Sequence, residues 1–525
     1  MAGNTANPRE RLCLVLYAAM LAMAMALIWG HRFPPMQDYP IWLSEGEVFR
    51  RCLSGSAGDN FSIVPYPVPN TASTAVIGLL ALAMPIESAG KVFLSLAMAI
   101  YAAGAYRITT PSPGQQRGIL SLTPLAWMLG FPFFHGNINY YLAVGLLLVG
   151  GGYLIRRAES LSSARLGPLL ALSLALFFSH ALVLAAWVAL LAAYLADRRR
   201  RGQWKTAAWS LAPVAVLWVG YLAGRVVRPM VPLYGPAEPV ASVTLWVKNK
   251  ITELLYYLCP FGQFHLSSPG AWPVALAAAN AVALAGLAVL AVAVAWRTSR
   301  DKHDRWLLAG CGVYLLGWMV APLYLGGVSS PGQRLVLPAL LGGLSLAARL
   351  RWGAKARIVA GAWVGALLIF TAVYWLVYVG GVSEKMADCH ARLRDLSLPG
   401  DCVHVDEGLF RFKGPLPSCR RQSIWQKALL GDHSVLGRLG YYLILERGGD
   451  GAVFGTSILR ARRYPLVPRT LEELRNAAPS CLVLVGCDDG NVLLAEALSV
   501  DYRLTQRQAN IMVMEKMSGD RQTAP

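Results

Sequence analysis

The chain has 525 residues, of which 55% are hydrophobic and only 15% are charged. A soluble globular protein carries about 25% charged residues, so this composition excludes a soluble enzyme and a disordered chain. The hydrophobic residues gather in runs of about 20, such as 12–30, 271–296 and 358–380, and a run of that length spans a bilayer as a helix. The sequence therefore predicts an α-helical polytopic membrane protein.

The charge distribution indicates how the chain is oriented in the membrane. Lysine and arginine exceed aspartate and glutamate by 19. Residues 1–380 hold 29 basic and 12 acidic side chains, whereas residues 381–525 hold 19 and 17. The basic excess belongs to the part with the apolar runs, where short basic loops stay in the cytoplasm. We interpret it as a topology signal and expect no nucleic-acid partner, although a pI near 9.7 would suggest one in a soluble protein.

The first apolar run, 12–30, follows two arginines and has no small-residue cleavage site after it. It predicts a retained span with a cytoplasmic N-terminus. The outer loop that follows, 31–70, is too long to be a mere connection. Within it, 41–53 predicts a short interfacial helix with Trp42 and Phe49 on one face.

The region 72–196 must cross the membrane an odd number of times, and two arrangements satisfy this. One splits 72–106 at Pro85 into two crossings and keeps 166–196 as one long helix. The other keeps 72–106 as one broken crossing and folds 166–196 into a hairpin around His180. Both give five crossings. We favour the second because it leaves five arginines of this region in the cytoplasm.

Three basic clusters in the second half of the membrane part mark the cytoplasmic side. Between and after them lie five apolar spans, 206–224, 271–296, 306–325, 334–349 and 358–380. The total is about eleven spans, which places the tail 381–525 outside the cytoplasm. A second long outer loop, 227–273, contains another helical pattern.

The tail has the composition of a small domain of its own. Helical patterns around 425–430, 471–477 and 492–498 alternate with β-like runs at 402–405, 452–454, 481–485 and 511–514. This alternation predicts a small extracytoplasmic α/β domain, so the chain divides into a transmembrane domain, 1–380, and this domain, 381–525. Five of the nine cysteines lie in the tail, where disulfides can form, but the pairing cannot be read.

Asp38 is the first candidate for a catalytic or metal-binding residue, because prolines flank it just beyond the first span. A carboxylate held there can act as a base or bind a metal ion, or it can cap the following helix. Its neighbours Gln37 and Tyr39 share this segment. Glu45 and Glu47 are alternative candidates for the catalytic carboxylate. They can equally form the solvent-exposed face of the helix.

Three polar residues near apolar stretches are further candidates. Asn137 and Asn139 lie in a turn between two spans, where polar residues are costly and often functional, or where they merely form the turn. His180 lies within a long apolar segment, and an interhelical hydrogen bond explains it as well as a role in a site does.

Three arginines at outer span ends could bind phosphate. Arg334 follows a segment rich in glycine and serine at the outer mouth of a span, and Arg225 and Arg228 follow the span 206–224. An arginine can clamp a phosphate with two hydrogen bonds. It can equally extend to lipid headgroups.

Together, the proline-flanked aspartate, the Gly-Asn-x-Asn turn, the late arginine and the terminal domain resemble bacterial membrane glycosyltransferases of the GT-C type. The group is that of the protein mannosyltransferases and aminoarabinose transferases. In uncharacterised members of this group the first loop reads Gln-Asp-x-Pro-x-His-Leu. The segment 37–43, Gln-Asp-Tyr-Pro-Ile-Trp-Leu, matches except that Trp42 replaces the histidine.

The resemblance implies a sugar donor linked to polyprenyl phosphate, an acceptor in the cell envelope and a place in the bacterial inner membrane. Asp38 would be the catalytic base or the ligand of a divalent cation, and Arg334 or Arg225 would bind the donor phosphate. Two other classes stay open. One is a non-catalytic scaffold of envelope polysaccharide assembly, and the other is a transporter, for which an inverted repeat is expected but not evident.

Overall fold

The computed structural model describes most of the membrane part and the strands of the tail. The described residues are 8–56, 61–111, 117–156, 166–196, 203–227, 243–261, 264–265, 272–298, 305–322, 324–325, 328–329, 331–395, 402–405, 430–431, 459–461, 481–485, 499, 502–508 and 511–517.

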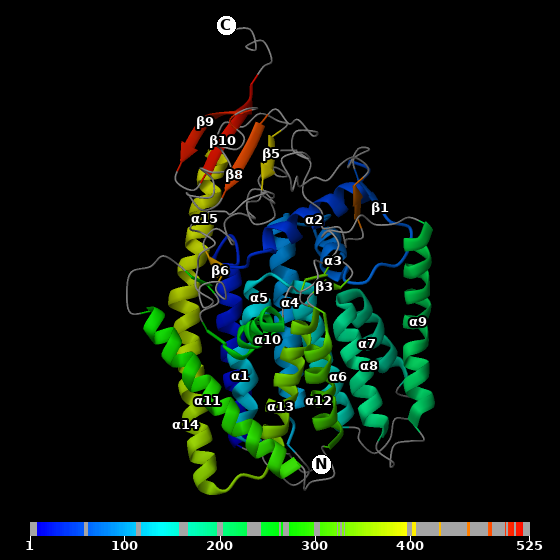
Figure 1. The fold of residues 1–525 in the computed structure, drawn as a ribbon, viewed down its shortest axis with the longest axis vertical. Helices are drawn as coiled ribbons and strands as arrows, with labels where there is room; N and C mark the ends of the chain where they lie inside the picture. Colours follow the sequence, from blue (N-terminus) through cyan, green and yellow to red (C-terminus); the bar gives the residue numbers. More distant parts are fainter. Residues whose placement is uncertain are drawn as a thin grey trace.

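The first half of the chain is helical, with two short helices at the outer end of the bundle (Figure 1). Its elements are α1 (Pro8–Gly30), α2 (Tyr39–Leu53), α3 (Ala72–Leu80), α4 (Ile86–Ile108), the 3₁₀ helix η1 (Ile119–Trp127), α5 (Phe131–Phe134), α6 (Ile138–Arg156), α7 (Leu166–Ser179) and α8 (Ala181–Ala196). The second half adds α9 (Trp204–Val227), α10 (Val243–Leu258), α11 (Trp272–Thr298), α12 (Arg305–Val320), the 3₁₀ helix η4 (Pro331–Leu335), α13 (Val336–Arg349), α14 (Ala354–Val373), the π-helix η5 (Tyr374–Val379) and α15 (Gly380–Asp395).

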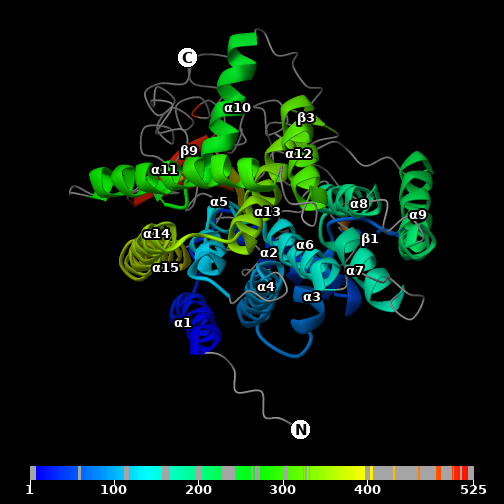
Figure 2. The ribbon, with the colours of Figure 1, turned by 90° about the horizontal axis from the view of Figure 1, so that it is seen from below.

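Among the described residues, six helices are long and apolar enough to cross a membrane, namely α1, α4, α6, α9, α11 and α14. Shorter apolar helices cover Ile119–Phe134, α7, α8 and α12. With α13, every one of the eleven predicted spans coincides with a helix. Seen from below, α9 and α1 stand at the periphery of the bundle (Figure 2), which suits helices whose apolar side chains face lipid.

The ambiguous region between α3 and α8 follows the second of the two predicted arrangements. α3 has nine residues, about 13 Å of helix at 1.5 Å per residue, which is too short to cross a bilayer core of about 30 Å. Only α4 in this stretch is long enough. α7 and α8 fold back on each other at His180, since Trp187 Nε1 donates a 3.2 Å hydrogen bond to Ser173 Oγ. The hairpin prediction is confirmed.

The tail contains a four-stranded sheet with the order β5 (Cys402–Val405), β8 (Cys481–Val485), β10 (Ile511–Lys516), β9 (Tyr502–Gln508). β5 pairs with β8 in parallel, and the other pairs are antiparallel. Three predicted strands are confirmed. β9 was not predicted. The expected strand 452–454 and the expected helices 471–477 and 492–498 lie outside the described residues. So does most of the expected helix 425–430, whose last residue, Leu430, belongs to a strand instead. Cys481 is in a disulfide, in agreement with the expectation that disulfides can form in the tail.

Both long outer loops pair with the tail. β1 (Phe61–Ile63) of the first loop pairs with β7 (Leu459–Ala461), and β2 (Phe264–His265) of the second pairs with β6 (Leu430–Gly431). The loops and the tail therefore lie on the same side of the bundle, as the predicted topology requires. Another two-stranded ribbon, β3 (Tyr324–Leu325) with β4 (Val328–Ser329), precedes η4.

The transmembrane part runs into the tail without a break in the helix. α14, η5 and α15 follow one another from 354 to 395, and Phe33 of the first outer loop packs against His390 of α15. The predicted division at 380 thus falls inside a continuous rod that rises from the bundle to the sheet (Figure 1).

Candidate functional site

Asp38 is the N-cap residue of α2, but its carboxylate does not do the capping. Its backbone carbonyl accepts hydrogen bonds from the amides of Ile41 and Trp42. Among the described residues, the side chain makes no capping hydrogen bond. The alternative interpretation of Asp38 as a helix cap therefore does not account for its carboxylate.

The carboxylate of Asp38 instead faces a histidine from another part of the chain. Oδ2 of Asp38 lies 3.7 Å from Nδ1 of His135, and the two side chains are 13% and 33% exposed. His135 ends the short helix α5, in the turn where the sequence pointed to Asn137 and Asn139. Its position in the same turn as these asparagines was the signal that could have identified it.

Gly136 allows this approach. Its φ of +83° belongs to the left-handed region, and a Cβ there would lie 2.6 Å from the backbone nitrogen of Asp38. Two hydrogen bonds fix the same turn, from Trp42 Nε1 to the Gly136 carbonyl at 2.6 Å and from the Gln37 amide to the Phe134 carbonyl at 2.8 Å. Trp42, which occupies the place of the expected histidine, thus holds the turn that presents His135.

Two further predicted site residues, Tyr39 and Asn137, make contacts that support the fold. The Tyr39 ring is fully buried, and its hydroxyl donates a 3.4 Å hydrogen bond to the Glu87 carbonyl. The Asn137 carbonyl accepts from the amide of Tyr141 and so begins α6. Tyr39 therefore points to α4.

The two glutamates of α2 are held by other groups. Glu45 is fully buried and accepts a 2.6 Å hydrogen bond from Thr74 Oγ1 of α3. The interpretation of Glu45 as part of the solvent-exposed face of the helix is therefore wrong. α3 covers this side of α2, which the sequence of α2 alone could not indicate. Glu47 accepts hydrogen bonds from Arg50 and Arg51. Burial alone would raise the pKa of Glu47, but these arginines outweigh it and lower the pKa.

Asn139 ties together the outer ends of three helices. Its Oδ1 accepts from the amide of Ser73 at 2.8 Å, and its Nδ2 donates to the Asn70 carbonyl at 2.7 Å. Asn70 in turn accepts from the amide of Ala181 through its side chain. Both amide ends of Asn139 are thus engaged in joining α3, α6 and the start of α8.

Arg334 lies in a cluster of rings from three other elements. Its carbonyl accepts a 2.8 Å hydrogen bond from the hydroxyl of Tyr140, and the Tyr140 ring meets the His180 ring edge-on with centroids 5.2 Å apart. The guanidinium is within electrostatic range of His180 and Tyr257. Arg334 and His180, predicted separately, are therefore brought together, and Tyr140 and Tyr257 join them.

Phe131 of α5 links the Asp38 group to the Arg334 group. Its ring centroid lies 5.1 Å from that of His135 and 5.5 Å from that of Tyr257. One short helix thus presents a ring to both groups. They form two adjacent parts of one region at the outer end of the bundle.

The other predicted arginines lie elsewhere. Arg225 donates a 3.4 Å hydrogen bond to the hydroxyl of Tyr221 on its own helix α9, and Tyr66 of the first outer loop packs near the same tyrosine. Arg228 lies outside the described residues.

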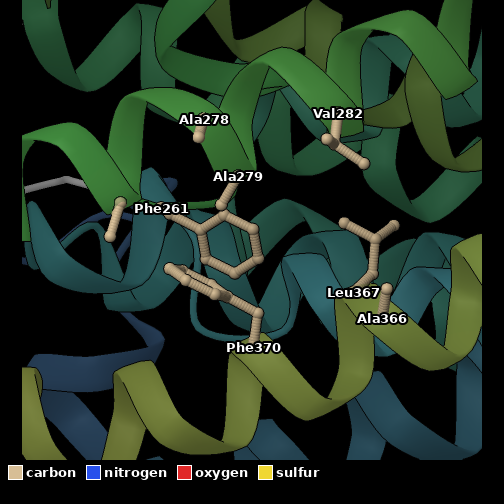
Figure 3. A pocket seen from close by; sticks show the side chains of 8 residues that line it. Phe261, Ala278, Ala279, Val282, Ala366, Leu367 and Phe370 are labelled. Atoms are coloured by element: carbon tan, nitrogen blue, oxygen red, sulfur yellow. The ribbon is translucent and has the colours of Figure 1, made fainter.

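An apolar groove of about 370 Å³ opens between α11 and α14 (Figure 3). It is lined by Phe261, Ala275, Ala278, Ala279, Val282, Ala366, Leu367 and Phe370. The rings of Phe261 and Phe370 lie 4.7 Å apart, Phe261 also contacts Tyr374, and Tyr374 contacts Phe134. A continuous series of rings therefore leads from the groove to the turn next to Asp38.

The region offers few ligands for a metal ion. Asp38 and His135 are one carboxylate and one imidazole, and no group of three His, Cys, Asp or Glu side chains occurs among the described residues. A divalent cation would need further oxygen ligands from water or substrate.

Comparison with known proteins gives a match by fold alone. No protein family model and no curated protein sequence matches the chain. The crystal structure of apo ArnT from Cupriavidus metallidurans matches with a TM-score of 0.50 and 12% identity, over 96% of this chain and 98% of that one. ArnT from the same organism bound to undecaprenyl phosphate gives a TM-score of 0.48 and 11% identity, over 97% of each chain.

The chain has an ArnT-like fold. The sequence resemblance to the GT-C aminoarabinose transferase group is confirmed at this level. Because the identity is 11–12%, the comparison assigns no residue of the site.

Proposed function

We propose that this chain is a membrane glycosyltransferase of the GT-C type. It moves a sugar from a polyprenyl-phosphate donor to a hydroxyl of an envelope acceptor at the outer face of the membrane. The observation that carries the proposal is the Asp38 carboxylate, which does not cap α2 and lies 3.7 Å from His135. The ArnT-like fold and the undecaprenyl phosphate bound by one such neighbour support this choice of donor.

In this mechanism Asp38 accepts the proton of the acceptor hydroxyl as a general base. The hydroxyl oxygen forms a bond to the anomeric carbon of the sugar, and the bond from that carbon to the phosphate oxygen breaks. Polyprenyl phosphate leaves with the bonding electrons. His135 orients the carboxylate, and Arg334 stabilises the negative charge on the departing phosphate.

The groove between α11 and α14 suits the polyprenyl chain of the donor. Its volume of about 370 Å³ is within the range of ligand pockets, roughly 300–1,000 Å³, and all its lining side chains are apolar. The series Phe261, Tyr374 and Phe134 connects it with the turn at Asp38. A chain seated there would place its phosphate near the site.

The proposed location is the bacterial inner membrane, with a cytoplasmic N-terminus and an extracytoplasmic tail. Basic clusters on one side, and strand pairs that join both outer loops to the tail on the other, support this orientation. A C-terminal alkaline phosphatase fusion should be active in cells. Activity of a fusion at 199–201 instead would reverse the orientation.

The deciding experiment is turnover by the purified full chain with a panel of polyprenyl-phosphate sugars. We expect wild type to release polyprenyl phosphate and Asp38→Asn to lose at least about 100-fold in turnover, the contribution of a general base. The variant should still bind the donor. Glu47→Gln, which changes another carboxylate of α2, should keep near wild-type turnover.

Equal turnover by wild type and Asp38→Asn would show that another residue is the general base. Failure of wild type to bind any donor of the panel would overturn the glycosyltransferase assignment. A scaffold in envelope polysaccharide assembly would then be the better account.

A further inference from the structure

Two buried polar atoms beside Arg334 are left without a hydrogen-bond partner. They are the hydroxyl of Tyr257, a residue 1% exposed, and Nδ1 of His180, a residue 9% exposed, and neither has a partner within the described part of the chain. A buried polar group without a partner is costly, so each such atom calls for an explanation. Both residues interact electrostatically with the same guanidinium.

The rings that carry these atoms are fixed. His180 and Tyr257 both pack against the Tyr140 ring, with centroid distances of 5.2 Å and 6.5 Å. Phe131 packs against Tyr257 as well. Because packing holds both rings in place, the two atoms can be satisfied by a ligand more readily than by rotation of the side chains.

The helix that carries Tyr257 is also anchored one turn earlier. Lys250 and Glu253 of α10 form a 3.1 Å ion pair, both side chains 4% exposed. Lys250 donates to the Trp318 carbonyl at 2.9 Å, and Trp318 Nε1 donates to Glu253 at 3.0 Å. This double contact with α12 fixes α10 beside η4, the element that carries Arg334.

The chemistry of the three groups together fits one kind of ligand. Guanidinium, phenol and imidazole can all donate hydrogen bonds, and burial keeps the pKa of Tyr257 above its ordinary value, so the phenol retains its proton. The carboxylate of Glu253 on the same helix is neutralised by Lys250. Donors around a permanent positive charge recognise a phosphate.

We propose that Tyr257 and His180 bind the phosphate of the donor lipid together with Arg334, through the phenolic hydroxyl and the Nδ1–H of the imidazole. This inference rests on the proposed function and deepens it, because it assigns head-group recognition to two residues of different outer segments. The ligand class is a phosphate ester of a long-chain polyprenol.

The test compares binding of a C55 polyprenyl phosphate with binding of the matching uncharged polyprenol, by thermophoresis of the detergent-solubilised full chain. Tyr257→Phe should weaken binding of the phosphate about tenfold, the effect of one lost hydrogen bond to a charged group, and leave polyprenol binding unchanged. Tyr256→Phe is the matched control, because Tyr256 stacks on the same Phe131 ring. It should change neither affinity by more than about twofold.

His180 supplies a second, independent pair of variants. His180→Leu should weaken phosphate binding about as much as Tyr257→Phe, and His180→Gln, whose amide can donate, should recover most of it. If Tyr257→Phe does not elute as a folded protein in gel filtration, the two His180 variants alone test whether this region binds the phosphate.

Three outcomes would overturn the inference. Unchanged phosphate binding by Tyr257→Phe and His180→Leu would show that these atoms do not meet the phosphate. An equal loss of polyprenol binding would show that they act only through packing. If wild type binds the phosphate and the polyprenol equally, the proposed donor itself is wrong. This result is distinguishable from the first two, because it appears in wild type and does not depend on the variants.

Discussion

Oδ2 of Asp38 lies 3.7 Å from Nδ1 of His135, although the two residues are 97 positions apart in the chain. At this distance the two side chains are neighbours, but the separation is longer than that of a hydrogen bond. His135 is therefore placed to limit how the Asp38 carboxylate can turn.

We predict that His135→Gln lowers turnover about 10-fold to 100-fold with little effect on donor binding. Without the imidazole the carboxylate can turn away from the acceptor hydroxyl, so the loss should appear in kcat and not in the affinity for the donor. Steady-state kinetics with a polyprenyl-phosphate sugar, together with donor binding, would measure the two separately. Turnover by His135→Gln equal to that of wild type would contradict the positioning role of His135.

Gly136 gives a second prediction, because the approach of Asp38 to His135 requires it. Gly136→Ala forces a left-handed conformation on alanine, at about 1–2 kcal/mol, and places a methyl 2.6 Å from the Asp38 nitrogen. Turnover should fall more than about 10-fold, with a lower melting temperature. Gly118→Ala is the control, because a Cβ there meets nothing within 4 Å among the described residues. Wild-type turnover by Gly136→Ala would exclude a tight turn at the site.

The sequence was informative where the signal was local. The prolines around Asp38 and the pattern of 41–53 predicted the segment and the helix that the structure has at Tyr39–Leu53. A basic loop and a histidine between apolar runs were enough to predict the hairpin of α7 and α8.

What escaped prediction depends on contacts between distant segments. Glu45 was misread because α3 buries it through Thr74. His135 was passed over because only the fold brings it to Asp38, and the position of Tyr257 near Arg334 depends on where α10 packs. A pattern within one helix shows which face is apolar, but it does not show which neighbour covers that face.

Glu47 gives a prediction about stability and pH. Its two arginine partners lower the pKa of Glu47, so this carboxylate stabilises the fold above its unfolded pKa, about 4.3. Glu47→Gln should lower the melting temperature in detergent by a few degrees at pH 7. That difference should shrink below pH 4.3 and vanish once the pH passes the lowered pKa of the folded state.

The control for Glu47 is Asp388→Asn, which breaks the exposed pair with Arg392. An exposed ion pair contributes little, so the melting temperature should hardly change. A Glu47→Gln difference that persists at pH 3 would show that the effect comes from packing and not from charge.

The groove between α11 and α14 gives a prediction that separates chain binding from chemistry. Ala279 faces the Phe261 ring inside it (Figure 3), so Ala279→Phe fills space that the polyprenyl chain would occupy. We expect KM for a C55 donor to rise about tenfold or more, since each buried CH₂ contributes about 0.8 kcal/mol. A short C10 donor, which does not reach the groove, should keep its kcat and KM.

Val292→Phe is the matched control, since Val292 lies on the same helix and is 72% exposed, facing outward. It adds the same ring without entering the groove, so both donors should react as with wild type. If Ala279→Phe impairs the short donor as strongly as the long one, the substitution disturbs the packing of α11 on α14, and the groove is not where the chain binds. If it impairs neither, the polyprenyl chain leaves the site by another route between the helices.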